Sequence, residues 1–345
     1  IFFLTYCSNM SNFDFICVGG YGKSGSGACV DLLKEFEAID GPSREFRIAK
    51  DPSGLLDLEL SIVDNWEFVR HNMAINDFLE YCLILSREDG IFKKKGMNFS
   101  SELNVDLMKE SEKYVNELND FMYIGDTVIS RYHLNAVQSF KCRLRSKFGL
   151  SNKSLMSFSR PTEDKFLVET RKYLRSIFEN YARNKKLSKV VLNQAISPVN
   201  IGKTLRYFDN AKLIIVDRDP RDIYTTMIRD RKLLMAEGLN NLENVNKYIK
   251  WFYAGRKQVS QDINYAYMKN RVMRLNYEDF YFNYEKTLEE IKEFLGLEIG
   301  FNHKDKGTGL QTEQVKKDIG IWKSLVDQDT ISVIERELGE YCFRK

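Results

Sequence analysis

Short apolar runs alternate along this chain with longer segments in which apolar residues recur at regular intervals. Four runs have the composition of buried strands and lie at residues 13–18, 189–192, 211–216 and 272–275. The run at 211–216 is almost continuously aliphatic, as in parallel strands that are buried on both faces. Helical spacing of apolar residues follows at residues 28–36, 223–235 and 285–295. Strands that alternate with helices predict an α/β fold built on a doubly wound parallel sheet.

The middle of the chain has a different pattern. Residues 55–185 are predicted to be largely helical, with apolar stripes and charged faces at residues 66–86, 104–121, 132–148 and 162–184. Such a block between early and later strands predicts a helical insertion or lid within one domain of residues 1–345. A basic stretch contains Arg143, Arg145, Lys147 and Lys153. It is either a solvated helix face or a site for an acidic substrate.

Composition narrows the class of protein only slightly. The chain has 345 residues, of which 43% are hydrophobic, which is enough for one large domain. A net charge of +3 indicates no general affinity for nucleic acid. No apolar stretch is long enough to span a bilayer, and six scattered cysteines without metal-ligand spacing suit a cytoplasmic protein with reduced thiols. Abundant Asn, Lys, Ile and Phe suggest an AT-rich, bacterial genome.

The first residues raise a separate question about the start of translation. The chain does not begin with methionine, and Met10 directly precedes the first predicted strand. We therefore expect Met10 to be the native start and residues 1–9 to be upstream sequence.

A glycine-rich turn joins the first strand to the first helix. The turn contains Gly22, Lys23, Ser24, Gly25, Ser26 and Gly27, and Ala28 opens the helical pattern. Backbone N–H groups in such a turn, together with a helix N-terminus, attract anions. Lys23 adds a positive charge and the serines add hydroxyl donors. This pattern predicts a cradle for phosphate or sulfate, whereas the alternative is a merely flexible turn.

Two kinds of anion cradle compete for this turn. The nucleoside-triphosphate loop G-x-x-x-x-G-K-[ST] matches at Gly22-Lys23-Ser24, but Cys17 stands where its first glycine belongs. The segment Lys23-Ser24-Gly25-Ser26-Gly27 resembles the loop of sulfotransferases instead. Gly22 replaces the proline of that loop, and Gly27 replaces its second threonine.

Three further segments resemble the sulfotransferase family. They are residues 213–226 (LIIVDRDPRDIYTT), residues 274–280 (RLNYEDF) with 294–297 (FLGL), and residues 316–323 (KKDIGIWK). The resemblance implies that Arg218 and Thr226 bind the 3′-phosphate of the sulfate donor, 3′-phosphoadenosine-5′-phosphosulfate (PAPS). It also implies that Lys316 and Lys317 belong to a basic segment that closes over the donor. As alternatives, Arg218 forms an ion pair with a neighbouring aspartate, and Thr226 is an ordinary helix residue.

The resemblance also implies the chemistry of the site. Lys23 would stabilise charge on the leaving phosphate oxygen, and no metal is expected. Cytosolic family members use a histidine base where this chain has Asn193 and Gln194. Carbohydrate and tyrosyl-protein members use a glutamate after the first helix, which falls here on Glu45, although they also keep a lysine near the position of Gln194. Glu45 is thus either the base or an exposed loop carboxylate, and His71 and His133 are reserve bases.

The sequence therefore predicts a PAPS-dependent sulfotransferase of the P-loop-like fold, of the carbohydrate or tyrosyl-protein type. The expected acceptor is a hydroxyl on a saccharide or glycolipid, with residues 55–185 as an insertion on the acceptor side. Two alternatives stay open. A P-loop kinase would use Asp217 to bind Mg²⁺, and a degenerate sulfotransferase-like protein would bind ligands without catalysis.

Overall fold

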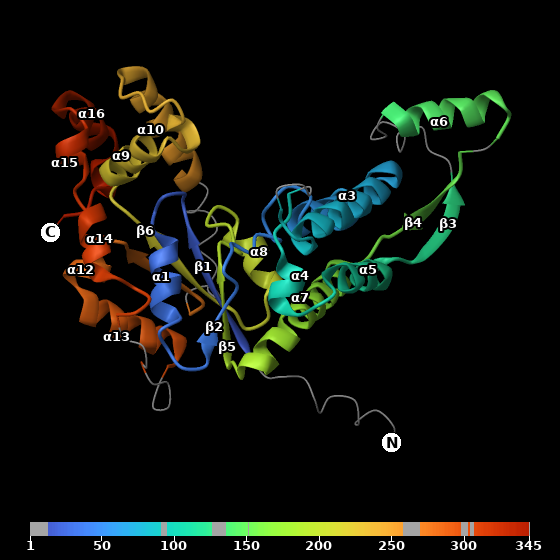
Figure 1. The fold of residues 1–345 in the computed structure, drawn as a ribbon, viewed down its shortest axis with the longest axis horizontal. Helices are drawn as coiled ribbons and strands as arrows, with labels where there is room; N and C mark the ends of the chain where they lie inside the picture. The colour runs from blue at the N-terminus through green and yellow to red at the C-terminus, as the bar shows by residue number, and fades with distance from the viewer. Residues whose placement is uncertain are drawn as a thin grey trace. The chain divides into compact units, whose positions relative to one another are not determined.

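The structure is a computed structural model that describes residues 13–90, 95–125, 136–150, 152–257, 270–297, 303 and 307–344. The predicted start at Met10 and the reserve base His133 lie outside these residues. The chain forms two compact units (Figure 1). Unit 1 comprises residues 1–47 and 182–345, and unit 2 comprises residues 48–181.

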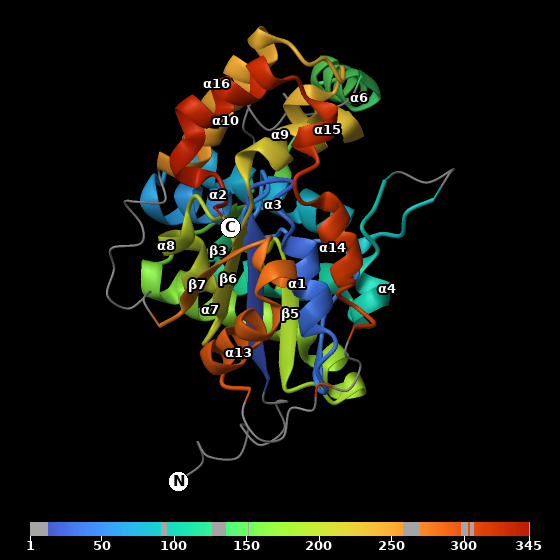
Figure 2. The ribbon, with the colours of Figure 1, turned by 90° about the vertical axis from the view of Figure 1, so that its left-hand side faces the viewer.

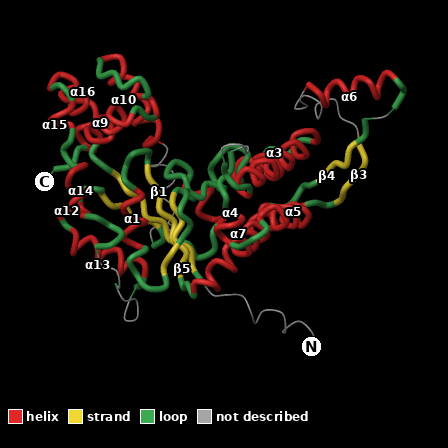
Figure 3. The backbone as a smooth tube through the Cα atoms, in the orientation of Figure 1, coloured by secondary structure: helices red, strands yellow, loops and turns green. Residues whose placement is uncertain are grey.

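A five-stranded parallel sheet forms the centre of unit 1 (yellow in Figure 3). Its order is β2 (Ile39–Asp40), β5 (Lys189–Asn193), β1 (Asp14–Gly20), β6 (Lys212–Asp217) and β7 (Val272–Asn276). The register places Val18 beside Asn193 and Gly20 beside Val216. The strands therefore end along one edge of the sheet, and the predicted α/β fold with a parallel sheet is confirmed.

Helices and loops cover both faces of this sheet with apolar side chains, so its central strands are buried. On one face α1 (Ser26–Leu33) and α13 (Tyr284–Leu295) pack on alternate residues of β1, β5, β6 and β7. Figure 2 shows these two helices in front of the strands. On the other face Phe15 packs edge-on against Phe208, which follows α8 (Ile201–Thr204), with ring centroids 5.5 Å apart.

The helices after β6 form a second apolar cluster in unit 1. It joins α9 (Pro220–Asp230), α10 (Leu242–Lys257) and α16 (Gln328–Leu338). Three short helices complete the unit: α12 (Asp279–Phe282), α14 (Thr312–Asp318) and α15 (Trp322–Leu325). The C-terminal helix α16 thus packs on α9, the helix that follows β6.

Unit 2 is mainly helical, as predicted, but it also contains a strand pair that the sequence analysis missed. Its helices are α2 (Leu55–Glu59), the π-helical turn η1 (Leu60–Asp64), α3 (Phe68–Ser86), α4 (Phe99–Leu103), α5 (Leu107–Leu118), α6 (Ala136–Lys147) and most of α7 (Glu163–Lys185). The antiparallel strands β3 (Phe121–Gly125) and β4 (Ser154–Phe158) fall inside the region predicted to be helical. Both strands are only five residues long, so their alternation is too short to stand out beside long helical patterns.

The edge strand β2 and the bounds of one helix differ from what the sequence predicts. β2, at Ile39–Asp40, is not among the four predicted runs, and Gly41-Pro42 ends its ladder because proline has no N–H to donate. The helix expected at residues 223–235 begins at Pro220, since the Asp219 side chain caps it by accepting from the Arg221 N–H at 2.8 Å. It ends at Asp230, and Arg231 follows with a left-handed φ of 49°.

Among the described residues, no helix combines the length and the apolar composition that crossing a membrane requires.

Candidate active site

The glycine-rich turn folds tightly at the end of β1. Gly22 and Lys23 both have positive φ, 63° and 59°, so the chain reverses within the turn. The Tyr21 N–H donates to the Ser24 hydroxyl at 3.1 Å, and a Cβ at Gly20 would lie 2.3 Å from that oxygen. The turn is therefore held by its own serine and is not a flexible link.

The start of α1 faces an open space. Gly25 is its N-cap, with a φ of 90° and no side-chain hydrogen bond to the first turn. A Cβ at Gly25 would lie 2.2 Å from the Tyr277 ring, so only glycine fits there, whereas a Cβ at Gly27 would meet nothing within 4 Å. The first N–H groups of α1 thus remain without a side-chain cap, an arrangement that attracts an anion.

Lys23 does not extend freely from the turn as the sequence suggested. Its Nζ lies 2.7 Å from a carboxylate oxygen of Asp230, the last residue of α9. The same carboxylate accepts from the Arg229 Nε at 3.0 Å. Burial raises the pKa of Asp230, but the bonds from Lys23 and Arg229 outweigh it and lower the pKa. The lysine of the cradle is therefore held by an ion pair in this state.

Arg218 connects the four predicted motifs. Its Nη1 donates to the carbonyl of Lys23 at 3.2 Å, and its Nη2 donates to the carbonyl of Asp318 at 2.5 Å. Its guanidinium lies 4.8 Å from the centre of the Tyr277 ring. Four segments that are distant in the sequence thus meet around one buried arginine.

The ion pairs proposed as alternatives for Arg218 do not form among the described residues. The carboxylate of Asp217 is bound by Arg256 and, at 3.4 Å, by Arg274. Asp219 pairs with Arg221 at 2.6 Å, and Asp222 accepts from backbone N–H groups. Asp217 is thereby engaged by two cations, which removes it from the role that a kinase would give it.

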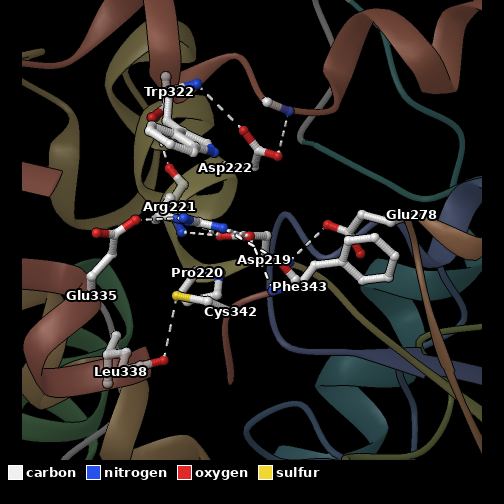
Figure 4. Close-up of polar contacts among 12 residues, drawn as sticks. Asp219, Pro220, Arg221, Asp222, Glu278, Trp322, Glu335, Leu338, Cys342 and Phe343 are labelled. Atoms are coloured by element: carbon white, nitrogen blue, oxygen red, sulfur yellow. Dashed lines mark hydrogen bonds and ion pairs between the residues drawn. The ribbon is translucent and has the colours of Figure 1, made fainter. Parts of the chain in front are cut away.

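The other charged groups after β6 fasten the C-terminal part of the chain to α9 (Figure 4). The Arg221 guanidinium lies between Asp219 and Glu335 and stacks on Trp322 at 4.4 Å. Asp219 also accepts from the Phe343 N–H at 3.1 Å. These groups have a structural role, so Arg218 is the member of this motif that is available to a ligand.

Asp222 holds the segment that follows α14 close to Arg218. Its carboxylate accepts from the N–H groups of Gly320, at 2.7 Å, and Trp322, at 3.4 Å. Burial raises the pKa of Asp222, partly offset by the Gly320 N–H and by Arg218. The segment that contains Lys316 and Lys317 is therefore anchored beside Arg218, and its closure over a donor stays a prediction.

Two buried polar atoms at this site have no protein partner within the described part of the chain. They are the Nε of Arg218 and the Oγ1 of Thr226. The neighbouring Thr225 differs, because its hydroxyl donates to the Arg221 carbonyl at 2.7 Å in the usual helical manner. A buried donor without a partner is costly, and a guanidinium N–H and a hydroxyl are both donors from which phosphate oxygens accept. The residues present therefore fit the 3′-phosphate of a PAPS-like donor.

Glu278 is a buried carboxyl next to this cluster. Its Oε1 accepts from the Asp219 N–H at 2.9 Å. Its Oε2 is buried and has no partner among the described residues. Burial raises the pKa of Glu278 to about 7, although the N–H of Asp219 and the charge of Arg218 oppose the rise. This group thus titrates near neutral pH.

Glu45 lies near the carboxyl edge of the sheet. The chain runs along β5 from Ile39, which pairs with Lys189, to Phe46, whose N–H donates to the Asn193 carbonyl at 3.1 Å. The Glu45 side chain is exposed, and its Oε2 lies 3.1 Å from the Nη1 of Arg47. The returning strand that a catalytic Glu45 requires is therefore present.

Gln194 is a site residue whose contacts the sequence analysis did not foresee. It has a left-handed φ of 58° at the end of β5 and is almost fully buried. Its Nε2 donates to the Ser26 hydroxyl at 2.9 Å. The departure from the family pattern at this position was its only sequence signal, and an uncharged amide now completes the cradle there.

The remaining candidates differ in their surroundings. Lys316 and Lys317 are exposed on α14, and Lys316 lines an open depression with Tyr281, Phe282 and Ile319. His71, in unit 2, is fully buried, and its two ring nitrogens lie 3.1 and 3.0 Å from backbone carbonyls of Glu67 and Ser157. A buried ring engaged on both sides has a structural role and is not an accessible base.

Comparison with known proteins agrees with this site. The family model described as "Sulfotransferase family" matches residues 124–301, which is 178 of the 345 residues. This range includes Arg218, Thr226 and Tyr277, whereas the loop at Lys23 lies outside it. No curated protein matches the chain at a significant level.

Several solved structures are similar to this chain at low identity. The sulfotransferase domain from the curacin biosynthetic pathway is 9% identical, with a TM-score of 0.42 over 94% of this chain and 98% of that one. The sulfotransferase domain of the Synechococcus PCC 7002 olefin synthase is 12% identical, with a TM-score of 0.43 over 98% of each chain. Sulfotransferase STF9 from Mycobacterium avium is 12% identical, with a TM-score of 0.40 over 96% of this chain and 76% of that one.

The fold defines an α/β protein of the P-loop-like class with a parallel sheet. The family match is more specific, and the chain belongs to the sulfotransferase family. It is a PAPS-dependent sulfotransferase.

Proposed function

We propose that this enzyme transfers the sulfuryl group of PAPS to a hydroxyl of a saccharide or glycolipid. Within this proposal, Arg218 and Thr226 hold the 3′-phosphate. The amides of residues 22–28 hold the 5′-phosphate, and Lys316 and Lys317 cover the donor. The observation that carries the proposal is the pair of buried, unpartnered atoms, Arg218 Nε and Thr226 Oγ1. Both belong to residues that the sequence motifs had already selected.

The chain's own groups can serve each end of the transfer. The acceptor oxygen forms a bond to sulfur while the bond from sulfur to the 5′-phosphate oxygen breaks. Glu45 takes the proton of the acceptor hydroxyl as general base. Lys23 leaves Asp230 and, with the loop amides, neutralises the negative charge that develops on the leaving oxygen. Gln194 supplies a neutral amide where other members of the family carry a cation. Lys23 and the loop amides therefore neutralise more of the charge on the leaving oxygen.

The acceptor class and the cellular location belong to the same proposal. A glutamate base is the pattern of carbohydrate and tyrosyl-protein members, and we favour a saccharide among them. Unit 2 would contribute to acceptor binding as the insertion in the domain. The described cysteines, Cys17, Cys29, Cys82, Cys142 and Cys342, are all free thiols, which supports a reducing, cytoplasmic location.

The donor assignment is tested with two neighbouring threonines. Thr226→Val removes a hydroxyl that has no protein partner, so folding should be unaffected, whereas the affinity for 3′-phosphoadenosine 5′-phosphate should fall by about tenfold. Affinity for adenosine 5′-phosphate, which lacks the 3′-phosphate, should not change. Thr225→Val is the matched control, because its hydroxyl bonds to the helix backbone. Titration calorimetry measures both affinities.

Arg218→Ala should show the same selectivity more strongly, with a loss of roughly 1.5–3 kcal/mol for the 3′-phosphorylated ligand. Because Arg218 also connects four segments of the chain, the thermal unfolding of the Arg218→Ala variant is measured in parallel. Equal losses for both ligands in Thr226→Val and Arg218→Ala would contradict the donor assignment.

A further inference from the structure

The stretch from Thr127 to the end of β4 has a composition unlike that of the rest of the chain. Residues 127–158 contain six lysines and arginines and no aspartate or glutamate. The remaining residues carry 46 cations and 49 carboxylates. The net positive charge of the protein is therefore concentrated in this one segment, which the proposed chemistry does not use.

Helix α6 lies in this segment and has no buried residue. Val137, Phe140 and Leu144 follow helical spacing, so their side chains form a stripe along one side. Phe148 and Leu150 follow the helix, and all five of these apolar side chains are between 44% and 70% exposed. An isolated helix of twelve residues is marginal in water without packing, so this stripe needs a partner surface.

The basic residues of α6 are arranged around the apolar stripe. By helical geometry Lys141 and Lys147 fall on either side of it, and Ser139, Cys142 and Ser146 lie on the opposite side. Lysines at these borders can keep their ammonium groups in water while the stripe is buried. Basic residues beside a stripe that contains Phe and Leu are one feature of helices that lie in the interface of a membrane.

The hairpin strands extend the apolar surface. Ile124 and Leu155 are a cross-strand pair at the end of β3 and the start of β4, so they share one face. They are 72% and 65% exposed. The exposed apolar side chains are thus found on the strands before and after α6 as well as on the helix itself.

We propose that the described residues 121–125, 136–150 and 152–158, the basic arm, bind the surface of an anionic lipid bilayer through α6, which is labelled in Figure 1. The absence of any carboxylate in residues 127–158 favours a negatively charged partner. A second copy of the chain would bring the same positive charge to the interface. A nucleic acid would match the charge, but it would leave Phe140, Leu144 and Phe148 uncovered. The proposal does not depend on the assignment of donor or acceptor, and it would bring the enzyme to lipid-linked acceptors.

Vesicle sedimentation tests the basic arm with the whole protein. Wild-type protein should sediment with vesicles of phosphatidylcholine mixed with phosphatidylglycerol, and not with pure phosphatidylcholine. Lys141→Gln with Lys147→Gln should weaken partitioning by roughly fivefold for each lysine. Phe140→Ser should weaken it by about tenfold. Because α6 has no buried residue, none of these variants should change the thermal unfolding temperature.

Two control variants test whether the loss of vesicle binding is specific to the basic arm. Lys286→Gln and Leu239→Ser alter exposed residues of unit 1 and should leave partitioning unchanged. Equal sedimentation of wild type and arm variants, or none with anionic vesicles, would overturn the proposal. Two other results would also overturn it if the protein did not bind vesicles. One is binding to a duplex oligonucleotide that the Phe140→Ser variant retains. The other is a dimer, detected by light scattering, that the arm variants no longer form.

Discussion

At the scale of single residues, Arg218 and Lys23 differ in how far they are prepared for the donor. Arg218 is fixed by the carbonyls of Lys23 and Asp318 and by the Tyr277 ring, with its Nε left unpaired. Lys23 is instead bound to Asp230. Under the proposed donor assignment the 3′-phosphate site is preformed, whereas Lys23 must leave Asp230 before it can act on the leaving group.

Asp230→Asn tests this exchange. Removing the carboxylate should free Lys23 and raise the affinity for 3′-phosphoadenosine 5′-phosphate by up to about fivefold, since a part-exposed ion pair is worth ~0–1 kcal/mol. Titration calorimetry measures the change. Glu289→Gln, which removes the exposed partner of Lys292, is the control and should have no effect. Weaker donor binding in Asp230→Asn would mean that Asp230 positions Lys23 productively.

Glu45→Gln tests the proposed base. The amide keeps the shape of the side chain but cannot accept the proton, so turnover should fall by about 10²–10⁴-fold. Calorimetry should show unchanged binding of 3′-phosphoadenosine 5′-phosphate, since no donor contact is assigned to Glu45. Glu290→Gln, on the exposed face of α13, is the comparison. Near-normal turnover of Glu45→Gln in a sulfate-transfer assay would eliminate Glu45 from catalysis.

At the scale of elements, a short returning strand decides where Glu45 lies. β2 has only two residues, yet it directs the chain along β5 to the carboxyl end of the sheet. Gly41 makes this path possible, because a Cβ there would lie 1.7 Å from the Val191 carbonyl oxygen. Gly41 is therefore required by the close approach of two backbones.

At the scale of the molecule, the C-terminal part of the chain is fastened to the sheet domain at two buried carboxylates. Glu35 accepts from the N–H groups of Gly309 and Leu310 and lies 2.5 Å from the Nε2 of His303. Asp219 accepts from the Phe343 N–H and pairs with Arg221. These ties hold residues 307–344 on the sheet domain, where Asp318 contacts Arg218, the residue that follows β6.

The buried carboxyl of Glu278 should make stability depend on pH. Burial raises its pKa to about 7 in the folded protein. Its contribution to stability is fully present below the unfolded pKa of ~4.3 and is lost as pH rises through 7. Glu278→Gln removes this dependence while keeping an acceptor for the Asp219 N–H. The free energy of unfolding of the variant minus that of the wild type should increase by about 2 kcal/mol from pH 5 to pH 8.

Chemical denaturation at the two pH values measures this difference, with Glu290→Gln, which removes an exposed carboxylate of α13, as the control for the loss of a charge. A relative stability that does not change between pH 5 and pH 8 would show that Glu278 is already ionised in the folded protein at pH 5.

The sequence by itself determined four strands of the parallel sheet, the glycine-rich turn and the arginine motif. Each is encoded locally: an aliphatic run predicts a buried strand, and glycines beside a lysine predict a turn that binds an anion. The resemblance to sulfotransferases selected Arg218 and Thr226 as candidates. The β3–β4 pair was missed because two five-residue strands inside a helical region give little periodicity.

Only the tertiary structure decided how these segments meet. Arg218 bonds to Lys23 across 195 positions and to Asp318 across 100, and Lys23 pairs with Asp230 across 207. Such pairings depend on the order of strands in the sheet and on the side chains that burial leaves without partners. Local spacing carries no information about either, and for that reason the hydroxyls of Thr225 and Thr226 are equivalent in the sequence and different in the fold.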